Sequence, residues 1–390
     1  MDVTDLRVAL FSGNYNYVRD GANQALNRLV AYLLRQGAAV RIYSPTVAEP
    51  ALPPNGEVVH IPAFAIPRRK EYRAPIMLPA RAKRDIADFA PNLFHIASPD
   101  ILGHRAVALA RKMDVAVVAS VHTRFETYLR YYGLAFAEPL IEAGLRRFYR
   151  RCDAIFAPSE SMAQLLREQR MNWEVGIWSR GIDRDFFNPG RRDMAWRRSL
   201  GIEDSVPVIG FVGRLVMEKG LDVYAETIER LSRRGVRHKV LVVGEGPARE
   251  WFEKNVPEAC FVGFQEGPDL GRAVASMDIL FNPSVTETFG NVTLEAMAAG
   301  IPVVAAIATG SESLVADGVT GRLVPAGDCD GFAAALAFYC TDSAARREAG
   351  AAGERASRRY GWDEINQQLV EAYLRVVRRH GADARAAGAA

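Results

Sequence analysis

Residues 207–222, PVIGFVGRLVMEKGLD, contain the unit from which this chain is built. A short apolar run ends in a glycine and a polar loop, and the stretch from about Gly220 to Arg233 then has the amphipathic pattern of a helix. Units of this kind follow one another along the sequence. Strands that alternate with helices form a parallel sheet with helical crossovers, so the pattern predicts an α/β fold.

The apolar runs fall into two series, which predicts two doubly wound domains at residues 1–180 and 190–361. The stretch Trp178–Gly190 combines glycine, proline and charge, and it predicts the connector between the domains. The Arg/Ala-rich tail after Tyr373 is expected to fray. The first series of strands is expected in RVALFSG, AVRIYSP, EVVHIPA, NLFHIAS, VAVVASVH and AIFAPS, and the second in PVIGFVG, KVLVVGEG, CFVGF, DILFNPS and IPVVAA.

Composition predicts a soluble, cytoplasmic protein in which both domains can bury a core, because 49% of the residues are apolar. The start MDVTDLR is polar, and no run approaches the roughly 18 apolar residues of a membrane span. The cysteines, Cys152, Cys260, Cys329 and Cys340, have neither CxxC nor metal-finger spacing and are expected to be reduced thiols. The triplets at 183–185 and 328–330 are expected to serve as caps and turns and not as metal sites.

Positive charge gathers in the first half of the chain. Residues 1–180 carry 24 Lys and Arg against 17 Asp and Glu, whereas residues 181–390 carry 25 against 29. Basic clusters beside apolar residues suit binding to an anionic membrane surface, to which each basic residue contributes roughly 1 kcal/mol of binding free energy. An ordinary solvated face is the alternative. No nucleic-acid-binding motif accompanies the charge. The clusters are Arg68, Arg69, Lys70 and Arg73; Arg81, Lys83 and Arg84; and Arg146, Arg147, Arg150 and Arg151.

The segment at 286–300, TETFGNVTLEAMAAG, predicts a glycine turn that opens a short helix. Asn291 is expected to cap a helix over about 292–299, which places Glu287 before the helix and Glu295 one turn inside it. The backbone N–H groups of the turn then face the same space, with the positive end of the helix dipole behind them. Such a site suits a nucleotide sugar; a solvated amphipathic helix is the alternative.

Further candidates follow the predicted strands, because ligands of doubly wound sheets bind beyond the carboxyl ends of the strands. Arg214 and Lys219 can hold a diphosphate, or they form a solvated charge pair. Gly21 opens the first helix, where it admits a phosphate or forms a plain turn. His122 is expected to bind a sugar, carry a proton or serve a structural role. The loop VGFQEG, residues 262–267, is expected to receive a base.

Several other catalytic signatures do not occur in the sequence. Walker A, HExxH and GxSxG motifs are missing, which disfavours an NTPase, a zincin and a hydrolase. The GxG at 244–246 lacks the third glycine of a dinucleotide fingerprint, so NAD is only weakly indicated.

Together these segments resemble the retaining GT-B glycosyltransferases of family 4 over nearly the whole chain. The motif Glu-x7-Glu is present as Glu287 to Glu295, and GRLVMEKGLD, FVGF and YGWDEINQQLVEAYL match the phosphate pair, base loop and crossover tail. The segments HIASPDILG, SVHTRFETYLRYYGL and RGIDRDFFNP are similar to the branch with GDP-mannose-dependent α-mannosyltransferases and sulfoquinovosyl-diacylglycerol synthases. Where many relatives carry Gly-Gly-x-x-Glu, this chain has Ala308-Thr-Gly-Ser-Glu312.

The resemblance implies a GT-B fold, with two Rossmann-like domains, a cleft between them and a C-terminal crossover helix at about 362–380 that joins the first domain. It implies an acceptor-binding first domain and a donor-binding second domain. The expected reaction is the retaining, metal-independent transfer of a hexose to a lipid or glycolipid in α linkage, with GDP-mannose favoured as donor and no cofactor. The enzyme is expected in the cytoplasm, with peripheral association on the inner face of the cell membrane through the basic first domain.

The family pattern also implies roles for the candidate residues. Arg214 and Lys219 would bind the diphosphate, and His122 and Glu287 would contact the transferred hexose as the other members of the catalytic set. The expected donor contacts are Gly21, Gly213, Val262, Phe264, Phe289, Gly290, Asn291, Val292 and Glu295, of which Glu295 would bind the ribose. The alternatives are a UDP-dependent enzyme (glucose, glucuronate or sulfoquinovose), a UDP-sugar epimerase of the same fold, a phosphorylase, which would need a pyridoxal lysine in a longer chain, and a noncatalytic nucleotide-binding module.

Overall fold

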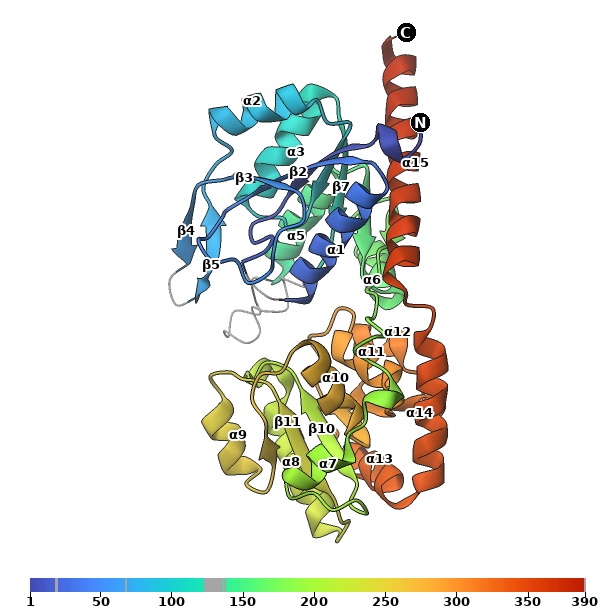
Figure 1. Ribbon diagram of the computed structural model, residues 1–390. Coiled ribbons are helices and arrows are strands. Elements are labelled where there is room, and N and C mark those ends of the chain that lie inside the picture. Colours follow the sequence, from blue (N-terminus) through green and yellow to red (C-terminus); the bar gives the residue numbers. More distant parts are fainter. Residues whose placement is uncertain (18–19, 67–68, 123–135, 137, 389–390) are drawn as a thin grey trace. The chain divides into compact units, whose positions relative to one another are not determined.

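A computed structural model describes residues 1–17, 20–66, 69–122, 136 and 138–388 of the chain (Figure 1). Its contacts divide the chain into two compact units: unit 1 is Met1–Arg180 with Trp362–Ala390, and unit 2 is Gly181–Gly361. Most of the expected connector therefore belongs to unit 2, where the Ile182 N–H donates to the Tyr360 carbonyl over 2.9 Å.

Unit 1 contains a seven-stranded parallel sheet in the order β3-β2-β1-β6-β7-β8-β9. The strands predicted for this half of the chain are confirmed. The sequence reading missed the short edge strand β9 and the antiparallel hairpin β4–β5, which have no apolar run of the usual length. The bounds are β1 Arg7–Phe11, β2 Ala39–Ser44, β3 Glu57–His60, β4 Ala63–Ile66, β5 Arg69–Pro75, β6 Leu93–Ile96, β7 Ala116–Ser120, β8 Ala154–Ala157 and β9 Val175–Ile177.

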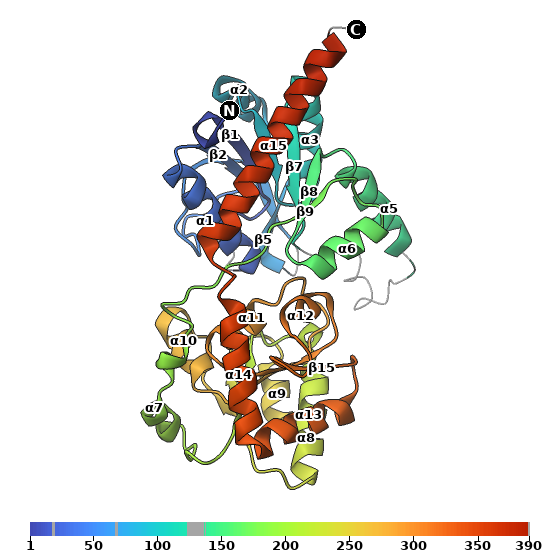
Figure 2. The ribbon, with the colours of Figure 1, turned by 90° about the vertical axis from the view of Figure 1, so that its right-hand side faces the viewer.

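Helices α1 (Gly21–Arg35) and α15 (Trp362–Gly388) lie side by side on unit 1 (Figure 2). Arg35 pairs with Asp363 across them at 2.7 Å, and the Tyr32 hydroxyl hydrogen-bonds the Gln367 side chain. The helix α15 continues past its predicted end near 380, to Gly388, and the fraying of the tail stays a prediction. Alanine and arginine are strong helix formers, and the Arg379 side chain is held by the Asp153 carbonyl at 3.0 Å.

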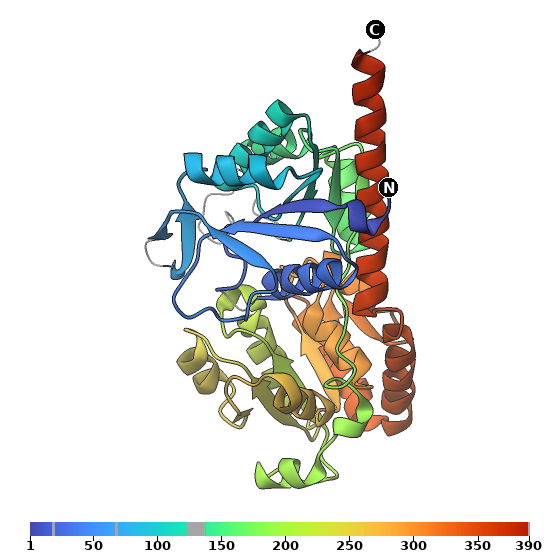
Figure 3. The same cartoon turned by 45° about the horizontal axis from the view of Figure 1, so that its top comes forward.

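The opposite face of this sheet carries α2 (Ala80–Phe89) and α3 (Ile101–Met113), which Figure 3 shows across the strands from α1. Phe11 and Phe94 stack on this face with ring centroids 5.0 Å apart, and they share a core with Ile86 of α2 and Leu102 of α3. Helices α5 (Glu138–Tyr149) and α6 (Glu160–Glu168) extend the same core.

Unit 2 contains a six-stranded parallel sheet in the order β12-β11-β10-β13-β14-β15. Successive residues face opposite cores: Val208 packs with α10 and α11, and Ile209 with α8 and α13. The predicted strands are confirmed, and β15 was missed. The strands are β10 Val208–Val212, β11 Lys239–Val243, β12 Cys260–Phe261, β13 Ile279–Asn282, β14 Val303–Ala306 and β15 Gly321–Val324. The helices are α7 Met194–Ser199, α8 Leu221–Arg233, α9 Arg249–Asn255, α10 Gly267–Ala275, α11 Asn291–Ala298, α12 Thr309–Leu314, α13 Cys329–Thr341 and α14 Ser343–Ser357.

The described helices include none that is both long and apolar enough to cross a membrane. The four cysteines are free thiols.

Asp278 ties α7 to the sheet of unit 2. Its Oδ2 accepts from Arg197 over 2.8 Å and from the Val208 N–H over 2.9 Å, and its Oδ1 accepts from Arg192 over 2.8 Å. The Arg197 side chain is fully buried and also donates to the Val206 carbonyl over 2.8 Å. A buried guanidinium depends on this carboxylate for its counter-charge.

Replacing Asp278 by Asn should destabilise the protein by about 3 to 5 kcal/mol, because it leaves the buried charge of Arg197 uncompensated. Urea unfolding measures the change. Asp204→Asn is the control, since Asp204 forms an ion pair with Arg198 at the surface and exposed pairs contribute about 1 kcal/mol or less. Equal effects of the two substitutions would contradict this account.

Candidate functional site

The loops after β10 and β11 are in direct backbone contact in unit 2. The Gly213 N–H donates to the Val243 carbonyl over 3.0 Å, and the Leu215 N–H donates to the Glu245 carbonyl over 2.9 Å. A Cβ on Gly244 would lie 1.9 Å from the Gly213 carbonyl oxygen, and one on Gly246 would lie 2.3 Å from that of Leu215. The GxG motif therefore allows two loops to meet, which explains it without a dinucleotide.

Lys219 and Glu287 come together at this edge of the sheet. The Lys219 Nζ lies 2.6 Å from the Glu287 Oε1, and both side chains are partly buried. Lys219 ends a 3₁₀ turn, Met217–Lys219, and Gly220 then turns into α8 with a positive φ of 73°. Arg214 lies exposed just after β10. The pair offers a ligand one cation and one hydrogen-bond acceptor in the same place.

The turn that carries Glu287 is fixed by the start of α12. The Glu287 carbonyl accepts from the Gly310 N–H over 3.0 Å and from the Thr309 hydroxyl over 2.8 Å. A Cβ on Gly310 would lie 2.8 Å from the Phe289 carbonyl carbon and oxygen. Thr309 and Gly310 belong to the segment that departs from the family pattern. In this chain, the turn that carries Glu287 is therefore held by a segment whose sequence differs from that of many relatives.

The helix after this turn begins differently from the prediction. Asn291 is the first residue of α11, and Gly290 occupies the N-cap position in the left-handed conformation with φ of 93°. The prediction of Asn291 as the cap is wrong because the turn requires a positive φ, which favours glycine. The Phe289 ring is buried against Tyr360, with centroids 5.9 Å apart. Val292 packs against the same core.

Glu295 lies partly buried one turn into α11. Its loss of solvation, and secondly the charge of Glu287, raise the pKa of the Glu295 carboxyl to about 7. Protonated and ionised forms are therefore both populated at neutral pH.

The loop after β12 presents an aromatic ring. The Val262 N–H donates to the Val242 carbonyl over 3.1 Å and its side chain packs on the core, whereas the side chain of Phe264 is 60% exposed. Gly263 turns the chain between them with φ of 72°. An exposed ring beside a fixed backbone suits stacking on a planar base.

In unit 1, Gly21 is the first residue of α1, and the Asp20 side chain caps the helix by accepting from the Asn23 N–H over 2.8 Å. Burial raises the pKa of the Asp20 carboxyl. The carboxyl group of Asp20 thus already occupies part of the helix start that was predicted to bind a phosphate. The role of Gly21 stays a prediction.

His122 follows β7 and uses both ring nitrogens within unit 1. Its Nε2 lies 2.8 Å from the Ser120 hydroxyl, and its Nδ1 lies 2.7 Å from the Arg180 Nη2. Burial, and then the charge of Arg180, lower the pKa of His122 well below its ordinary value, so the ring is neutral. Sequence reasoning missed Ser120 and Arg180; Arg180 opens the segment RGIDRDFFNP, the only signal that could have found it. The motif residues at 123–134 lie outside the described part of the chain.

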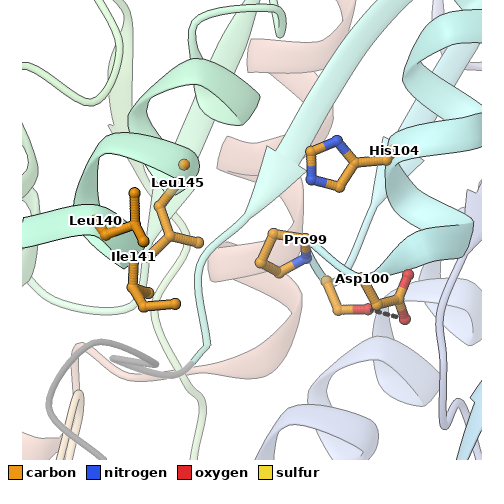
Figure 4. A pocket seen from close by; sticks show the side chains of 8 residues that line it. Pro99, Asp100, His104, Leu140, Ile141 and Leu145 are labelled. Atoms are coloured by element: carbon orange, nitrogen blue, oxygen red, sulfur yellow. Dashed lines mark hydrogen bonds between the residues drawn. The ribbon is translucent and has the colours of Figure 1, made fainter. Parts of the chain in front are cut away.

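A pocket of about 330 Å³ lies between α5 and the loop before α3 in unit 1 (Figure 4). Asp100 at its edge caps α3, accepting from the Gly103 N–H and the Ser98 hydroxyl, each over 2.8 Å. Leu140 is 76% exposed at the mouth. The sequence reading did not find this largely apolar pocket, which is lined by Ser98, Pro99, Asp100, His104, Leu140, Ile141, Gly144 and Leu145.

The basic clusters of unit 1 differ in their surroundings. Arg81, Lys83 and Arg84 are exposed on α2, and the preceding Ile76 and Met77 are also exposed. The cluster at 146–151 is partly held by hydrogen bonds: Arg146 donates to the Gln169 carbonyl over 2.9 Å, and Arg150 donates to the Arg170 carbonyl over 3.1 Å. Arg68 lies outside the described residues.

Within the described residues, no three His, Cys, Asp or Glu side chains are grouped to hold a metal ion. The two Asp-x-Asp triplets form a turn and a helix cap, as predicted. Asp183 accepts from the Asp185 N–H over 3.2 Å, and Asp328 caps α13 by accepting from the Gly331 N–H over 2.9 Å. Asp330 pairs with Arg234 at 3.2 Å.

Known proteins match this chain along nearly its whole length. Residues 19–186 match the family model "Glycosyltransferase Family 4", and residues 206–342 match "Glycosyl transferases group 1". A GDP-mannose-dependent alpha-mannosyltransferase of Mycolicibacterium smegmatis is 32% identical over 96% of this chain and 98% of that protein. The chain belongs to the GT-B glycosyltransferases of family 4.

Two further comparisons agree with this membership. A sulfoquinovosyl transferase of Arabidopsis thaliana is 29% identical over 91% of this glycosyltransferase and 71% of that protein. The structure of sucrose-phosphate synthase from Thermosynechococcus elongatus shares the fold, with a TM-score of 0.74 at 19% identity over 95% of this chain and 98% of that chain. The family resemblance and the GT-B fold predicted from the sequence are confirmed, whereas the roles of the individual site residues stay predictions.

The raised pKa of Glu295 predicts how the stability of this glycosyltransferase depends on pH. A carboxyl with a pKa of about 7 when folded and about 4.3 when unfolded holds its proton more tightly in the folded chain. The contribution of this carboxyl to the free energy of unfolding is therefore complete below about pH 4 and is lost as the pH rises through 7. The loss is on the order of 3 kcal/mol. Unfolding at a series of pH values should show this decline in the wild type and a weaker one in Glu295→Gln; parallel curves would contradict it.

Proposed function

We propose that this glycosyltransferase moves mannose from GDP-mannose to a lipid or glycolipid acceptor, with retention of configuration and without a metal ion or cofactor. The observation that carries the proposal is the Lys219–Glu287 pair, with 2.6 Å between Nζ and Oε1, beside the partly buried Glu295. The choice of donor is supported by the similarity to a GDP-mannose-dependent alpha-mannosyltransferase over 96% of the chain.

In this proposal, Arg214 and Lys219 stabilise the charge that develops on the leaving diphosphate. The sugar–phosphate bond breaks before the acceptor hydroxyl has fully attacked from the same face, which gives an oxocarbenium-like state. The diphosphate accepts the acceptor's proton. Loss of one preorganised partner of such a charge typically costs about 3 to 4 kcal/mol of barrier.

The carboxylates hold the donor and do not act as nucleophile and acid. Glu287 already shares a hydrogen bond with Lys219, which lowers the nucleophilicity of that carboxylate and leaves it as an acceptor for sugar hydroxyls. Glu295 accepts from the ribose hydroxyls when it is ionised. The exposed ring of Phe264 stacks on the base, and backbone groups from Phe289 to Asn291 contact the hexose.

The acceptor assignment rests on unit 1. The apolar pocket between α5 and the loop before α3 suits the hydrocarbon part of a lipid. Exposed Ile76 and Met77 precede the basic residues of α2, a combination that favours peripheral binding to an anionic membrane. This would place the enzyme on the inner face of the cell membrane.

Other donors compete with GDP-mannose. The sulfoquinovosyl transferase among the relatives favours a UDP-sugar as the second candidate. A UDP-sugar epimerase would convert its donor with no acceptor, and a binding module would hold a nucleotide without turnover.

A panel of GDP- and UDP-sugars tests the donor by thermal shift and by transfer to a glycolipid. We expect GDP-mannose to stabilise the protein and to give an α-linked product. Arg214→Ala and Lys219→Ala should each lower kcat by roughly 100- to 1000-fold with little effect on melting temperature, whereas Lys254→Ala, at an exposed position of α9, should keep wild-type activity.

The outcomes separate the alternatives. If no guanine nucleotide stabilises the protein, GDP-mannose is ruled out. Normal turnover by the Arg214 and Lys219 variants would contradict their assignment to the diphosphate. Binding without any product would favour a binding module, and conversion of the donor without an acceptor would favour an epimerase.

Gly144→Phe tests the acceptor pocket. Among the described residues, a Cβ on Gly144 meets no atom within 4 Å, so we expect the larger side chain to be accommodated on α5 and to fill the pocket. We expect the KM for a long-chain glycolipid to rise by roughly tenfold or more, with donor binding unchanged. Ala143→Phe, at the exposed neighbouring position outside the pocket, should leave this KM unaltered; equal effects of the two variants would show that the pocket does not hold the acceptor.

A further inference from the structure

A chain of hydrogen bonds runs through the interior of unit 1 and includes His122. The Arg180 Nη2 lies 2.7 Å from the His122 Nδ1, and the His122 Nε2 lies 2.8 Å from the Ser120 hydroxyl. That hydroxyl lies 2.8 Å from the His95 Nε2, and the His95 Nδ1 lies 2.6 Å from the Tyr373 hydroxyl. The chain thus connects α15, β6 and β7 with Arg180, the last residue of the first segment of unit 1.

The surroundings hold these groups in place. Trp178 lies beneath the Arg180 guanidinium, 5.0 Å from ring centroid to Cζ, and its ring meets both His95 and His122 edge to face at 5.8 and 5.7 Å. The Trp178 Nε1 donates to Asn366 of α15 over 3.3 Å. Arg180 is further fixed by donating to the Trp178 and Ser179 carbonyls.

The bond to Arg180 fixes the position of the proton on His122. Arginine has donors and no acceptor, so the His122 Nδ1 must accept, and a neutral ring must carry its proton on Nε2. The Nε2–H then donates to the Ser120 oxygen. Ser120 in turn donates to the His95 Nε2 or accepts a second bond from it, and Tyr373 takes the complementary role at the His95 Nδ1.

The charges agree with this arrangement. Burial lowers the pKa of Arg180 to about 10, opposed by the charge of Asp20, so the guanidinium remains protonated at neutral pH. Burial lowers the pKa of His95 to about 3 and raises that of the Tyr373 hydroxyl well above its ordinary value. A second proton on His122 would turn its Nδ1–H toward the donors of Arg180 and break the chain.

We propose that Arg180, Ser120, His95 and Tyr373 are positioning residues that hold His122 as the neutral Nε2–H tautomer. The effect on catalysis rests on the proposed function, in which His122 contacts the transferred hexose; the tautomer itself does not. A ring locked in this form orients a sugar and does not carry a proton, so the acceptor's proton goes to the diphosphate.

The tautomer is measured by long-range ¹H–¹⁵N correlation NMR on full-length protein with ¹⁵N-labelled histidine, with His122→Asn to identify the signals. We expect His122 to be neutral and protonated on Nε2 from about pH 5 to pH 8. In Arg180→Met the partner that can only donate is gone, so His122 should populate both tautomers, while burial keeps the pKa of the ring below its ordinary value. Arg35→Met, which removes a surface ion pair of the same unit, should leave the His122 signals unchanged.

Kinetics then test whether the position matters. Ser120→Ala removes the partner of Nε2 and Tyr373→Phe removes one hydroxyl at the far end, and we expect kcat to fall roughly 10- to 100-fold in Ser120→Ala and less in Tyr373→Phe. The KM for the donor should change little in both. Tyr43→Phe is the control, because Tyr43 is a buried tyrosine of the same unit whose hydroxyl binds Asp85 over 2.8 Å, and it should keep the wild-type kcat.

The results decide whether the chain of hydrogen bonds positions His122 for catalysis or only stabilises unit 1. A His122 protonated on Nδ1, or doubly protonated at neutral pH, overturns the inference in the wild-type protein even where a variant does not fold. A wild-type kcat in Ser120→Ala overturns the positioning role, and a lowered melting temperature with unchanged kcat assigns the chain to stability alone. If no nucleotide sugar is turned over, the proposed function fails, and the NMR measurement still decides the tautomer.

Discussion

The close approach of two backbone loops at Gly213 and Gly244 is the constraint on which the donor side of unit 2 depends. No side chain fits at Gly244, since a Cβ would lie 1.9 Å from the Gly213 oxygen. The loop after β10 is thereby fixed along the loop after β11. A Cβ on Gly310 would lie 2.8 Å from the Phe289 carbonyl, and one on Gly220 would lie 3.2 Å from Pro283, so these glycines allow further, less extreme contacts. Lys219 and Glu287 are brought to 2.6 Å by backbone packing that begins with these glycines.

The fold could be predicted from the sequence where the signal is local. Buried parallel strands such as β7 read as continuous apolar runs, whereas the three residues of β9 and the hairpin β4–β5 carry no such signal. Asn291 has the chemistry of a cap, but the choice between it and Gly290 depends on φ, which the turn against α12 imposes. The helix α15 extends past its predicted end because the Arg/Ala-rich tail has a high intrinsic helix propensity.

The residues of the candidate site also differ in whether the local sequence could predict them. Residues on motifs, such as Lys219, Glu287 and Glu295, could be named from spacing, because the Glu-x7-Glu pattern and the strand-end cations lie on contiguous segments. The partners of His122 could not. Tyr373 is separated from His95 by 278 residues, and a serine, a histidine and a tyrosine on three elements form no pattern until the sheet and α15 bring them together.

The free-energy cost of burying the hydrogen-bonded side chains from Arg180 to Tyr373 indicates what they are for. Each member loses its hydration, and an intramolecular hydrogen bond returns only about 0.5 to 1.5 kcal/mol net. Apolar side chains of similar volume are often as stabilising as a buried ionic or polar network. Stability alone therefore does not account for a guanidinium, two imidazoles and two hydroxyls in the interior of unit 1. A requirement that His122 present one fixed, neutral ring does, because an obligate donor at Nδ1 specifies a single tautomer of a neutral ring and the other bonds hold that ring in place.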